Sequence, residues 1–326
     1  MPGPEEPAPS DGPRVPLGPV VQPKSDFVPR GFDRTRAFAW KNGGTLRRMS
    51  TTGLLDRPEL TRARIDARAS GENFPVASIV APRRARPHLR AIYGFARLVD
   101  NLGDEAPGDR TALLDALERE LDGPPRTEIM RRLHETISAC DLPREPFARL
   151  IEANRIDQRK SRYETWAEVK EYCTYSADPV GRLVLGVYGR AEPELVAHSD
   201  DVCTGLQLVN FLQDAPRDLA LGRVYLPQED LRRFAVRDEE LAGPRSERLG
   251  ELLRFEAERA RALLASGFPL ARALGGRAGR SVALFARGGL AALAALEHAG
   301  WDVFSARPAP GRLTFARLTL AELVRR

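Results

Sequence analysis

The sequence is poor in cysteine and histidine, and this excludes several kinds of site. The three cysteines are odd in number and far apart, which predicts reduced core thiols rather than a disulfide framework. The four histidines show no zinc-ligand spacing with one another or with a cysteine. We therefore expect neither a disulfide-stapled domain nor a structural zinc site.

Long apolar runs and nucleotide-binding turns are also missing. No run approaches the roughly 20 apolar residues that cross a bilayer, and the N-terminus lacks the apolar core of a signal peptide. No Gly-x-Gly-x-x-Gly turn is present, so the sequence shows no recognisable binding site for NADPH, and we do not expect it as a cofactor. Because 42% of residues are hydrophobic and 29% are charged, the composition is that of a soluble globular protein. We predict a cytoplasmic location.

The net charge of +5 is concentrated near the N-terminus. Residues 1–70 carry 12 Lys and Arg against 8 Asp and Glu, whereas the remainder is close to neutral. The later arginines are mixed with carboxylates along predicted helix faces, the usual pattern of solvated surfaces. No basic stripe with interleaved aromatic residues is present, so we expect no nucleic-acid partner.

The N-terminal segment is rich in proline and poor in large apolar residues. Nine prolines fall within the first thirty residues, a composition that cannot bury enough surface to offset the entropy of ordering. Residues 31–70 remain polar and basic, with glycines that interrupt any long periodicity. We predict that residues 1–70 form a disordered, Pro/Arg-rich tail and that the folded domain begins near Gly71.

The remainder of the chain predicts an all-α fold. Breaks that contain proline or glycine separate segments such as 111–121 and 248–264, where the strong helix formers Ala, Leu, Arg and Glu dominate. Strand-like alternation is scarce, and no repeat of fixed period is present. The predicted organisation is one helical domain that follows the N-terminal tail.

Two polar stripes interrupt otherwise apolar predicted helices. In the first, Tyr93, Arg97, Asp100 and Asp104 recur at steps of four, three and four, so a helix places them on one face. The second stripe has steps of three, four and four and consists of Gln207, Asn210, Asp214 and Asp218. The residues around the second stripe are apolar on most sides, which predicts a buried helix.

Paired carboxylates on buried helices need partners. Two carboxylates one turn apart repel, and the repulsion grows in a dry interior. Mg²⁺ would remove this repulsion, because the ion prefers oxygen ligands. Substrate phosphates commonly complete its coordination shell. The alternative is that each pair is an ordinary solvated or salt-bridged helix face. Two such stripes, about 110 residues apart, favour a magnesium-diphosphate site formed by both aspartate pairs.

These motifs resemble a known family. Segments 91–105, 207–218 and 222–227 resemble the squalene/phytoene synthase family. Segments 72–78 and 172–181 are most similar to its bacterial hopanoid-pathway branch, the hydroxysqualene synthases. The resemblance spans roughly residues 71–305, which it implies to be one catalytic domain followed by a C-terminal extension over 306–326. It leaves the N-terminal tail unexplained.

The resemblance implies an isoprenoid-synthase helical bundle with a central active-site cavity. The four aspartates of the two stripes, Asp100, Asp104, Asp214 and Asp218, would bind several magnesium ions together with the substrate diphosphate. Gln207 and Asn210 would lie beside them as substrate-binding residues. Phe74 and Ser78 would also bind substrate, as parts of the cavity wall near the first motif; simple packing is an equal alternative for both.

Further roles follow from the same resemblance. Tyr93 and Arg97 are implied to act catalytically, and Arg223 to bind substrate, through contacts with the diphosphate or its leaving oxygen. Tyr172 would lie near the carbocation and act catalytically. Without the resemblance, a tyrosine at helical spacing is more often a core residue, and an arginine more often lies on the surface.

Two positions depart from the family's pattern. Asn101 stands where the family often has a second aspartate, which predicts weaker metal binding at that end. Pro216 lies inside the second motif, where it removes a helical N–H and crowds the carbonyl of Leu212. We expect a kink between Asp214 and Asp218.

The expected activity is that of a prenyl-diphosphate-processing synthase, a transferase or lyase acting on a carbon–oxygen bond. Presqualene diphosphate would be ionised with the help of Mg²⁺, and water would capture the cation to give hydroxysqualene and diphosphate. The alternatives are a presqualene diphosphate, squalene or phytoene synthase that joins two prenyl diphosphates head to head, a class I terpene cyclase, and a catalytically silent scaffold. A lipid product makes peripheral membrane contact an additional expectation for location and partners.

Overall fold

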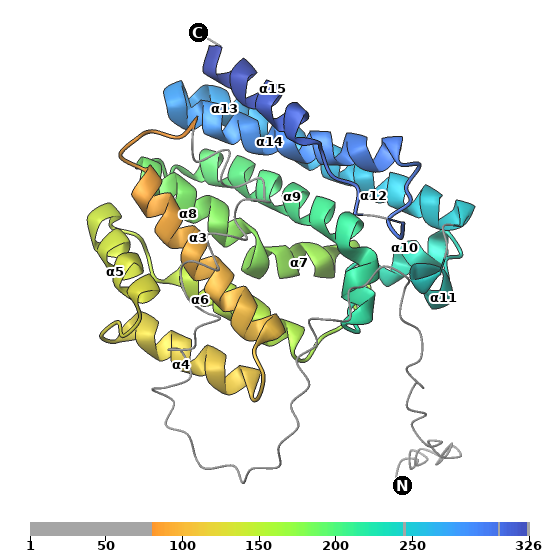
Figure 1. Cartoon of the computed structure of the whole chain (residues 1–326), viewed down its shortest axis with the longest axis horizontal. Coiled ribbons are helices and arrows are strands. Elements are labelled where there is room, and N and C mark those ends of the chain that lie inside the picture. Colours follow the sequence, from red (N-terminus) through yellow and green to blue (C-terminus); the bar gives the residue numbers. More distant parts are fainter. Residues whose placement is uncertain (1–79, 244–245, 306, 325–326) are drawn as a thin grey trace, which may run out of the picture. The chain divides into compact units, whose positions relative to one another are not determined.

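The structure is a computed structural model that describes residues 80–243, 246–305 and 307–324 (Figure 1). All of these residues belong to one compact unit. The predicted tail at 1–70 lies outside the described residues.

Helices make up the described part of the chain. In order they are α3 (Arg86–Asp100), η4 (Asn101–Glu105), α4 (Arg110–Asp122), α5 (Glu128–Cys140), α6 (Glu145–Asp157), α7 (Trp166–Ser176), α8 (Asp178–Tyr188), α9 (Pro193–Ala220), α10 (Gln228–Arg233), α11 (Asp238–Ala242), α12 (Glu247–Ala265), α13 (Gly267–Leu274), α14 (Gly276–His298) and α15 (Arg312–Val324). The described ranges contain no β-strand, and a single isolated bridge pairs Arg162 with Val224. The prediction of an all-α bundle is confirmed.

Local sequence explains where several helices begin. Side-chain oxygens of Asp109, Thr127, Thr165 and Ser246 accept hydrogen bonds from backbone N–H groups in the first turns of α4, α5, α7 and α12. Such caps satisfy donors that the helix itself leaves unpaired. Proline lies in the first turn of α8 and α9, where its missing N–H costs nothing. Short polar and proline-containing segments therefore set the helix boundaries.

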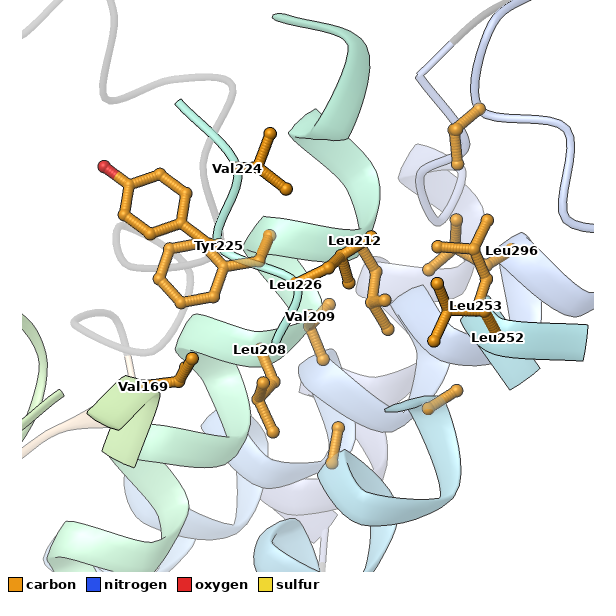
Figure 2. Packing of buried hydrophobic residues seen from close by; sticks show 14 of the residues in the cluster. Val169, Leu208, Val209, Leu212, Val224, Tyr225, Leu226, Leu252, Leu253 and Leu296 are labelled. Atoms are coloured by element: carbon orange, nitrogen blue, oxygen red, sulfur yellow. The ribbon is translucent and has the colours of Figure 1, made fainter. Parts of the chain in front are cut away.

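The long helix α9 lies at the centre of the bundle, with α7 and α8 on one side and α12 and α14 on the other (Figure 1). Figure 2 shows three residues of α9 beside residues of α12 and α14: Leu208, Val209, Leu212, Leu252, Leu253 and Leu296. A second core cluster joins α3 to the helices from α4 to α6 and to α8. The expected burial of the second-stripe helix is confirmed, so its polar residues are held in a rigid setting.

One expectation needs correction. Helix α14 is long and apolar enough to cross a membrane by composition, with a mean hydropathy of 1.2 over its most apolar window. We expected no such segment, because no unbroken run in the sequence approaches the roughly 20 apolar residues that cross a bilayer. In the structure 61% of that window is buried, as in the core helix of a globular protein. A single helix of this kind is weak evidence for a membrane span.

Candidate active site

A cavity of about 700 Å³ opens between the helices that carry the two polar stripes. Among the residues that line it are ten predicted site residues: Tyr93, Arg97, Asp100, Asp104, Tyr172, Gln207, Asn210, Asp214, Asp218 and Arg223. The other two predicted site residues, Phe74 and Ser78, lie outside the described residues. The fold therefore brings both stripes, about 110 residues apart in sequence, to one cavity.

The first stripe spans a change of helix type. Tyr93, Arg97 and Asp100 lie on α3, whereas Asp104 lies on the π-helical turn η4. Wide turns of this kind occur often at functional sites. Gly103 lets η4 approach α6 closely, because an added Cβ would lie only 1.9 Å from Oδ1 of Asn154. The side-chain amide of Gln158 also donates to the Gly103 carbonyl at 3.0 Å. Packing against α6 thus fixes the position of Asp104.

Arg223 connects the first stripe to the centre of the cavity wall. Its side chain is only 10% exposed, and its Nη1 donates to Oδ1 of Asp104 at 2.7 Å. The same nitrogen lies 4.0 Å from Oδ2 of Asp157. Although burial opposes its charge, Asp157 and Asp104 keep the pKa of Arg223 above its usual value. Arg223 is a fixed cation at the polar end of the cavity.

Asp157 is a cavity residue that the sequence did not reveal. Its carboxylate accepts hydrogen bonds from the hydroxyls of Tyr172 at 2.7 Å and Tyr225 at 2.9 Å. Burial raises the pKa of Asp157 to about 6, while Arg223 and the two tyrosine donors act in the opposite direction. The resulting network holds Tyr172 in one orientation against the cavity.

Aromatic rings gather around this network. The rings of Phe211 and Tyr225 are stacked with centroids 4.2 Å apart, and Tyr172 lies 5.5 Å from Tyr225 and 6.3 Å from Phe211. All three residues line the cavity. Aromatic faces attract cations, with a strength of about 2 kcal/mol when the site is desolvated. This wall is therefore suited to a positively charged intermediate.

The second stripe lies entirely on α9. The helix continues through Pro216 to Ala220, and both Asp214 and Asp218 line the cavity. Pro216 therefore does not prevent both carboxylates from lining one cavity, and the kink expected between them stays a prediction. Burial, together with the negative charge of the neighbouring Asp214, raises the pKa of Asp218 to about 7. The second motif therefore contains the carboxylate repulsion that its spacing predicted.

The C-terminal segment supplies a second cation. Nε of Arg307 lies 2.6 Å from Oδ1 of Asp214, and its Nη2 donates to Oδ2 at 3.0 Å. The next residue, Pro308, accepts a hydrogen bond from the side-chain amide of Gln213. Arg307, Ala309, Pro310 and Phe315 all line the cavity. Residues beyond the predicted domain end at 305 therefore form part of the site wall.

The oxygen donors on the cavity wall fit magnesium. They are the carboxylates of the two aspartate pairs and the amide of Asn210, the hard ligands that this ion prefers. Within the described residues, no group of three or more His, Cys, Asp and Glu could hold a metal by itself. Substrate phosphates and water would have to complete the coordination, as is common for Mg²⁺.

Much of the remaining cavity wall is apolar. Among the residues that line it are Leu150, Val180, Val184, Val202, Leu270, Val282 and Phe285, from five helices. A polar end with carboxylates and arginines thus continues into a hydrocarbon-like body. This division suits a molecule with a charged head and a long apolar chain.

Local patterns gave weak signals for the residues that were missed. Tyr225 lies within the segment 222–227, beyond the end of α9 at Ala220, so it does not continue the second stripe on that helix. Asp157 is a lone acid at the end of α6, and Arg307 is one of many arginines. Only the tertiary fold places these three residues at the cavity.

Comparisons with known proteins agree with this arrangement. The family model described as squalene/phytoene synthase matches residues 67–314. A hydroxysqualene synthase from Sinorhizobium fredii is 40% identical over 211 residues, which cover 63% of this chain and 72% of that protein. A phytoene synthase from Arthrospira platensis is 32% identical over 210 residues, covering 58% of this chain and 68% of that protein.

A solved structure agrees as well. The crystal structure of a squalene synthase from Alicyclobacillus acidocaldarius is 43% identical and superposes with a TM-score of 0.67. The match covers 78% of this chain and 99% of that one. With both aspartate motifs at one cavity and the family model matching most of its length, the chain belongs to the squalene/phytoene synthase family.

Proposed function

We propose that the protein converts presqualene diphosphate and water into hydroxysqualene and diphosphate, with Mg²⁺ as the cofactor. The observation that carries this proposal is the single cavity, with both aspartate pairs at its polar end, an aromatic wall and an apolar body. The similarity to a hydroxysqualene synthase at 40% identity supports the choice of substrate and product.

The polar end would bind and ionise the substrate. The carbon–oxygen bond to the diphosphate breaks, and its electron pair leaves with the diphosphate. Bound magnesium would neutralise the charge that develops on the leaving group. Arg223 and Arg97 line the same end and would add fixed positive charge, so the departing oxygen meets preorganised partners.

The aromatic wall would then stabilise the carbocation. Tyr172 stays protonated at neutral pH, because burial raises its pKa well above the usual value. Its hydroxyl donates a hydrogen bond to Asp157 at 2.7 Å, so the oxygen lone pairs can accept a hydrogen bond from a molecule in the cavity. Tyr172 can accept a hydrogen bond from a water molecule and leave the oxygen of that water directed at the cation.

A second polar side chain, that of Ser176, follows Tyr172 in the sequence. Ser176 is one helical turn after Tyr172 on α7, and it also lines the cavity. Its Oγ is buried and has no hydrogen-bond partner among the described residues. Buried polar atoms normally have a partner, and a water molecule commonly serves. We assign to Tyr172 and Ser176 the role of holding the water that captures the cation. Its oxygen forms the new carbon–oxygen bond, and the proton that the water loses passes to the released diphosphate.

The first experiment identifies the product. Purified protein is incubated with presqualene diphosphate and Mg²⁺, with and without NADPH, and the lipids are analysed by mass spectrometry. Hydroxysqualene formed equally well in both reactions is expected. Squalene that forms only with NADPH would contradict water capture.

A parallel reaction with farnesyl diphosphate addresses the second candidate, head-to-head joining of two prenyl diphosphates. The similarity to a phytoene synthase favours keeping this candidate. Accumulation of presqualene diphosphate from farnesyl diphosphate would assign the protein to that preceding step.

The second experiment tests the water position. Ser176→Ala should divert part of the cation from alcohol to an olefin formed by proton loss, because its water is held less firmly. Ser199→Ala is the matched control, since this serine also lines the cavity but lies on α9. Unchanged product ratios in Ser176→Ala would remove Ser176 from the proposal.

A further inference from the structure

Helix α15 carries an apolar face that the described fold leaves uncovered. Leu313, Leu320, Leu323 and Val324 are 75%, 62%, 43% and 70% exposed. Only one other large hydrophobic residue is exposed in the described ranges, Leu221 at 49%. Exposed apolar side chains are thus concentrated on one short helix, and a contiguous patch of this kind marks an interaction site.

The opposite face of α15 is fixed to the domain. The helix runs along α14 at the upper edge of the view in Figure 1. Leu318 and Phe285 pack against the cluster that contains Leu284, and Glu322 is buried and lies 2.7 Å from Arg287. The exposed residues Leu313, Leu320 and Val324 recur at steps of seven and four, so they form one outward stripe. This helix therefore has an apolar face on the outside as well as on the inside.

The charges around the stripe favour an anionic partner. Arg317 is exposed on α15 and lies four residues from Leu313 and three from Leu320, on the outward face. The sequence continues after Val324 with Arg325 and Arg326. The only acid of α15, Glu322, is turned inward and neutralised by Arg287. Outward leucines flanked by arginines are the pattern of helices that lie on anionic lipid.

The position of α15 connects this face with the cavity. The segment that leads into the helix lines the cavity with Arg307, Ala309 and Pro310, and Phe315 in the first turn of α15 does the same. A surface that holds α15 would therefore lie beside the cavity wall. With 13 residues α15 is about 20 Å long, short of the roughly 30 Å hydrocarbon core, so it can lie on a bilayer but not span it.

We propose that the outward face of α15 docks on an anionic phospholipid membrane, so that the cavity exchanges its lipid substrate and product with the bilayer. The docking surface is the stripe of Leu313, Leu320, Leu323 and Val324 together with Arg317. The reason for exchange rests on the proposed function, but the contact itself depends only on this surface.

The test measures sedimentation of the full-length protein with vesicles, in the absence of substrate. Vesicles of phosphatidylcholine alone are compared with vesicles that also contain phosphatidylglycerol. Wild-type protein should sediment with the mixed vesicles and less with the neutral ones. Because burying one leucine is worth at least about tenfold in affinity, Leu320→Glu should weaken binding at least about tenfold. Arg317→Glu should reduce the preference for the anionic vesicles, by about fivefold or more.

Ala139→Glu provides the matched control, since it adds the same charge at an exposed position of α5. It should sediment like the wild type. Leu320→Glu should retain its melting temperature and its turnover of detergent-dispersed presqualene diphosphate, because Leu320 is exposed and does not line the cavity. Turnover and vesicle binding are separate readouts, so failure of the proposed reaction cannot be mistaken for failure of the membrane contact.

Three results would overturn the proposal. Wild-type protein could stay in the supernatant with both kinds of vesicle. Leu320→Glu could sediment as well as the wild type. Sedimentation velocity could instead show a wild-type dimer that Leu320→Glu converts to a monomer, without vesicle binding, in which case a second copy of the chain covers the face.

Discussion

The two aspartate motifs face one cavity, but different parts of the chain neutralise them. In the first motif Asp104 is held by Arg223, a side chain that is 10% exposed and whose Nη1 lies 4.0 Å from Asp157 of the cavity's central network. In the second motif Asp214 is held by Arg307, which is 52% exposed and comes from the C-terminal segment. One counter-charge belongs to the core, and the other lies at the surface.

This difference indicates how each motif would respond to a magnesium-diphosphate ligand. A buried cation between Asp104 and Asp157 is costly to move, because either carboxylate would be left uncompensated. An exposed pair contributes little and exchanges easily with solvent ions. We therefore expect the first motif to be preorganised and the second to be adjustable.

The largest expected effect comes from removing the carboxylates themselves. Asp100→Ala, Asp104→Ala, Asp214→Ala and Asp218→Ala should each lower turnover by at least about 10³-fold, because each change removes a ligand for the charged groups of the reaction. Helical circular dichroism should persist, since none of the four is an apolar core residue. Near wild-type turnover at limiting Mg²⁺ in any two of these variants would contradict the metal assignment.

Stability separates the two counter-charges directly. Arg223→Ala should reduce the free energy of unfolding by about 3 kcal/mol, because it leaves Asp104 and Asp157 without their buried partner. Arg307→Ala should cost less than about 1 kcal/mol, as exposed pairs do. Urea unfolding of both variants measures the difference. Equal losses in the free energy of unfolding would mean that the two arginines contribute equally to stability, which would contradict the comparison.

The pH dependence of stability probes the second motif. The folded-state pKa of Asp218, about 7, lies above its ordinary value, so the folded protein holds this proton more tightly than the unfolded chain. The associated stability is fully present below about pH 4 and is lost as the pH rises toward 7. In Asp218→Asn the fall in the free energy of unfolding between pH 4 and pH 7 should be smaller than in the wild type by roughly 1 to 3 kcal/mol. Urea unfolding in metal-free buffer measures this difference.

The exposed Asp238→Asn serves as the control for that titration, since its side chain is 58% exposed in the native protein. Its stability profile should follow the wild type. A wild-type profile for Asp218→Asn would show that Asp218 is not strained by burial.

The smallest expected effect concerns the Mg²⁺ dependence. If Arg307 competes with the ion for Asp214, Arg307→Ala should lower the half-saturating Mg²⁺ concentration by up to about fivefold. Arg162→Ala is a matched control, because Arg162 forms a similar pair with Asp238 away from the cavity. A higher Mg²⁺ requirement in Arg307→Ala would instead indicate that Arg307 assists ligand binding.

The sequence was most informative where the helical period itself decides the structure. Polar residues at steps of three and four on apolar helices must share a face, and the eight residues of the two stripes all line the cavity. The burial of α9 followed from the apolar residues on its other faces. Local pattern and tertiary structure agree in both cases.

The features that were not predicted depend on contacts between distant segments. The π turn that carries Asp104 is packed against Asn154, fifty-one residues beyond its Gly103. Asp157 becomes a site residue only because Tyr172 and Tyr225 converge on it. Arg307 reaches Asp214 across 93 residues. No local pattern in the sequence encodes these partners.

Oxygen-18 water tests the central claim most directly. Presqualene diphosphate is converted in labelled water with Mg²⁺ and without NADPH, and the product is analysed by mass spectrometry. Capture of the cation by water predicts hydroxysqualene with one labelled oxygen at its new alcohol group. An unlabelled alcohol would mean that the diphosphate was cleaved at phosphorus and the carbon–oxygen bond stayed intact, which would contradict ionisation in this cavity.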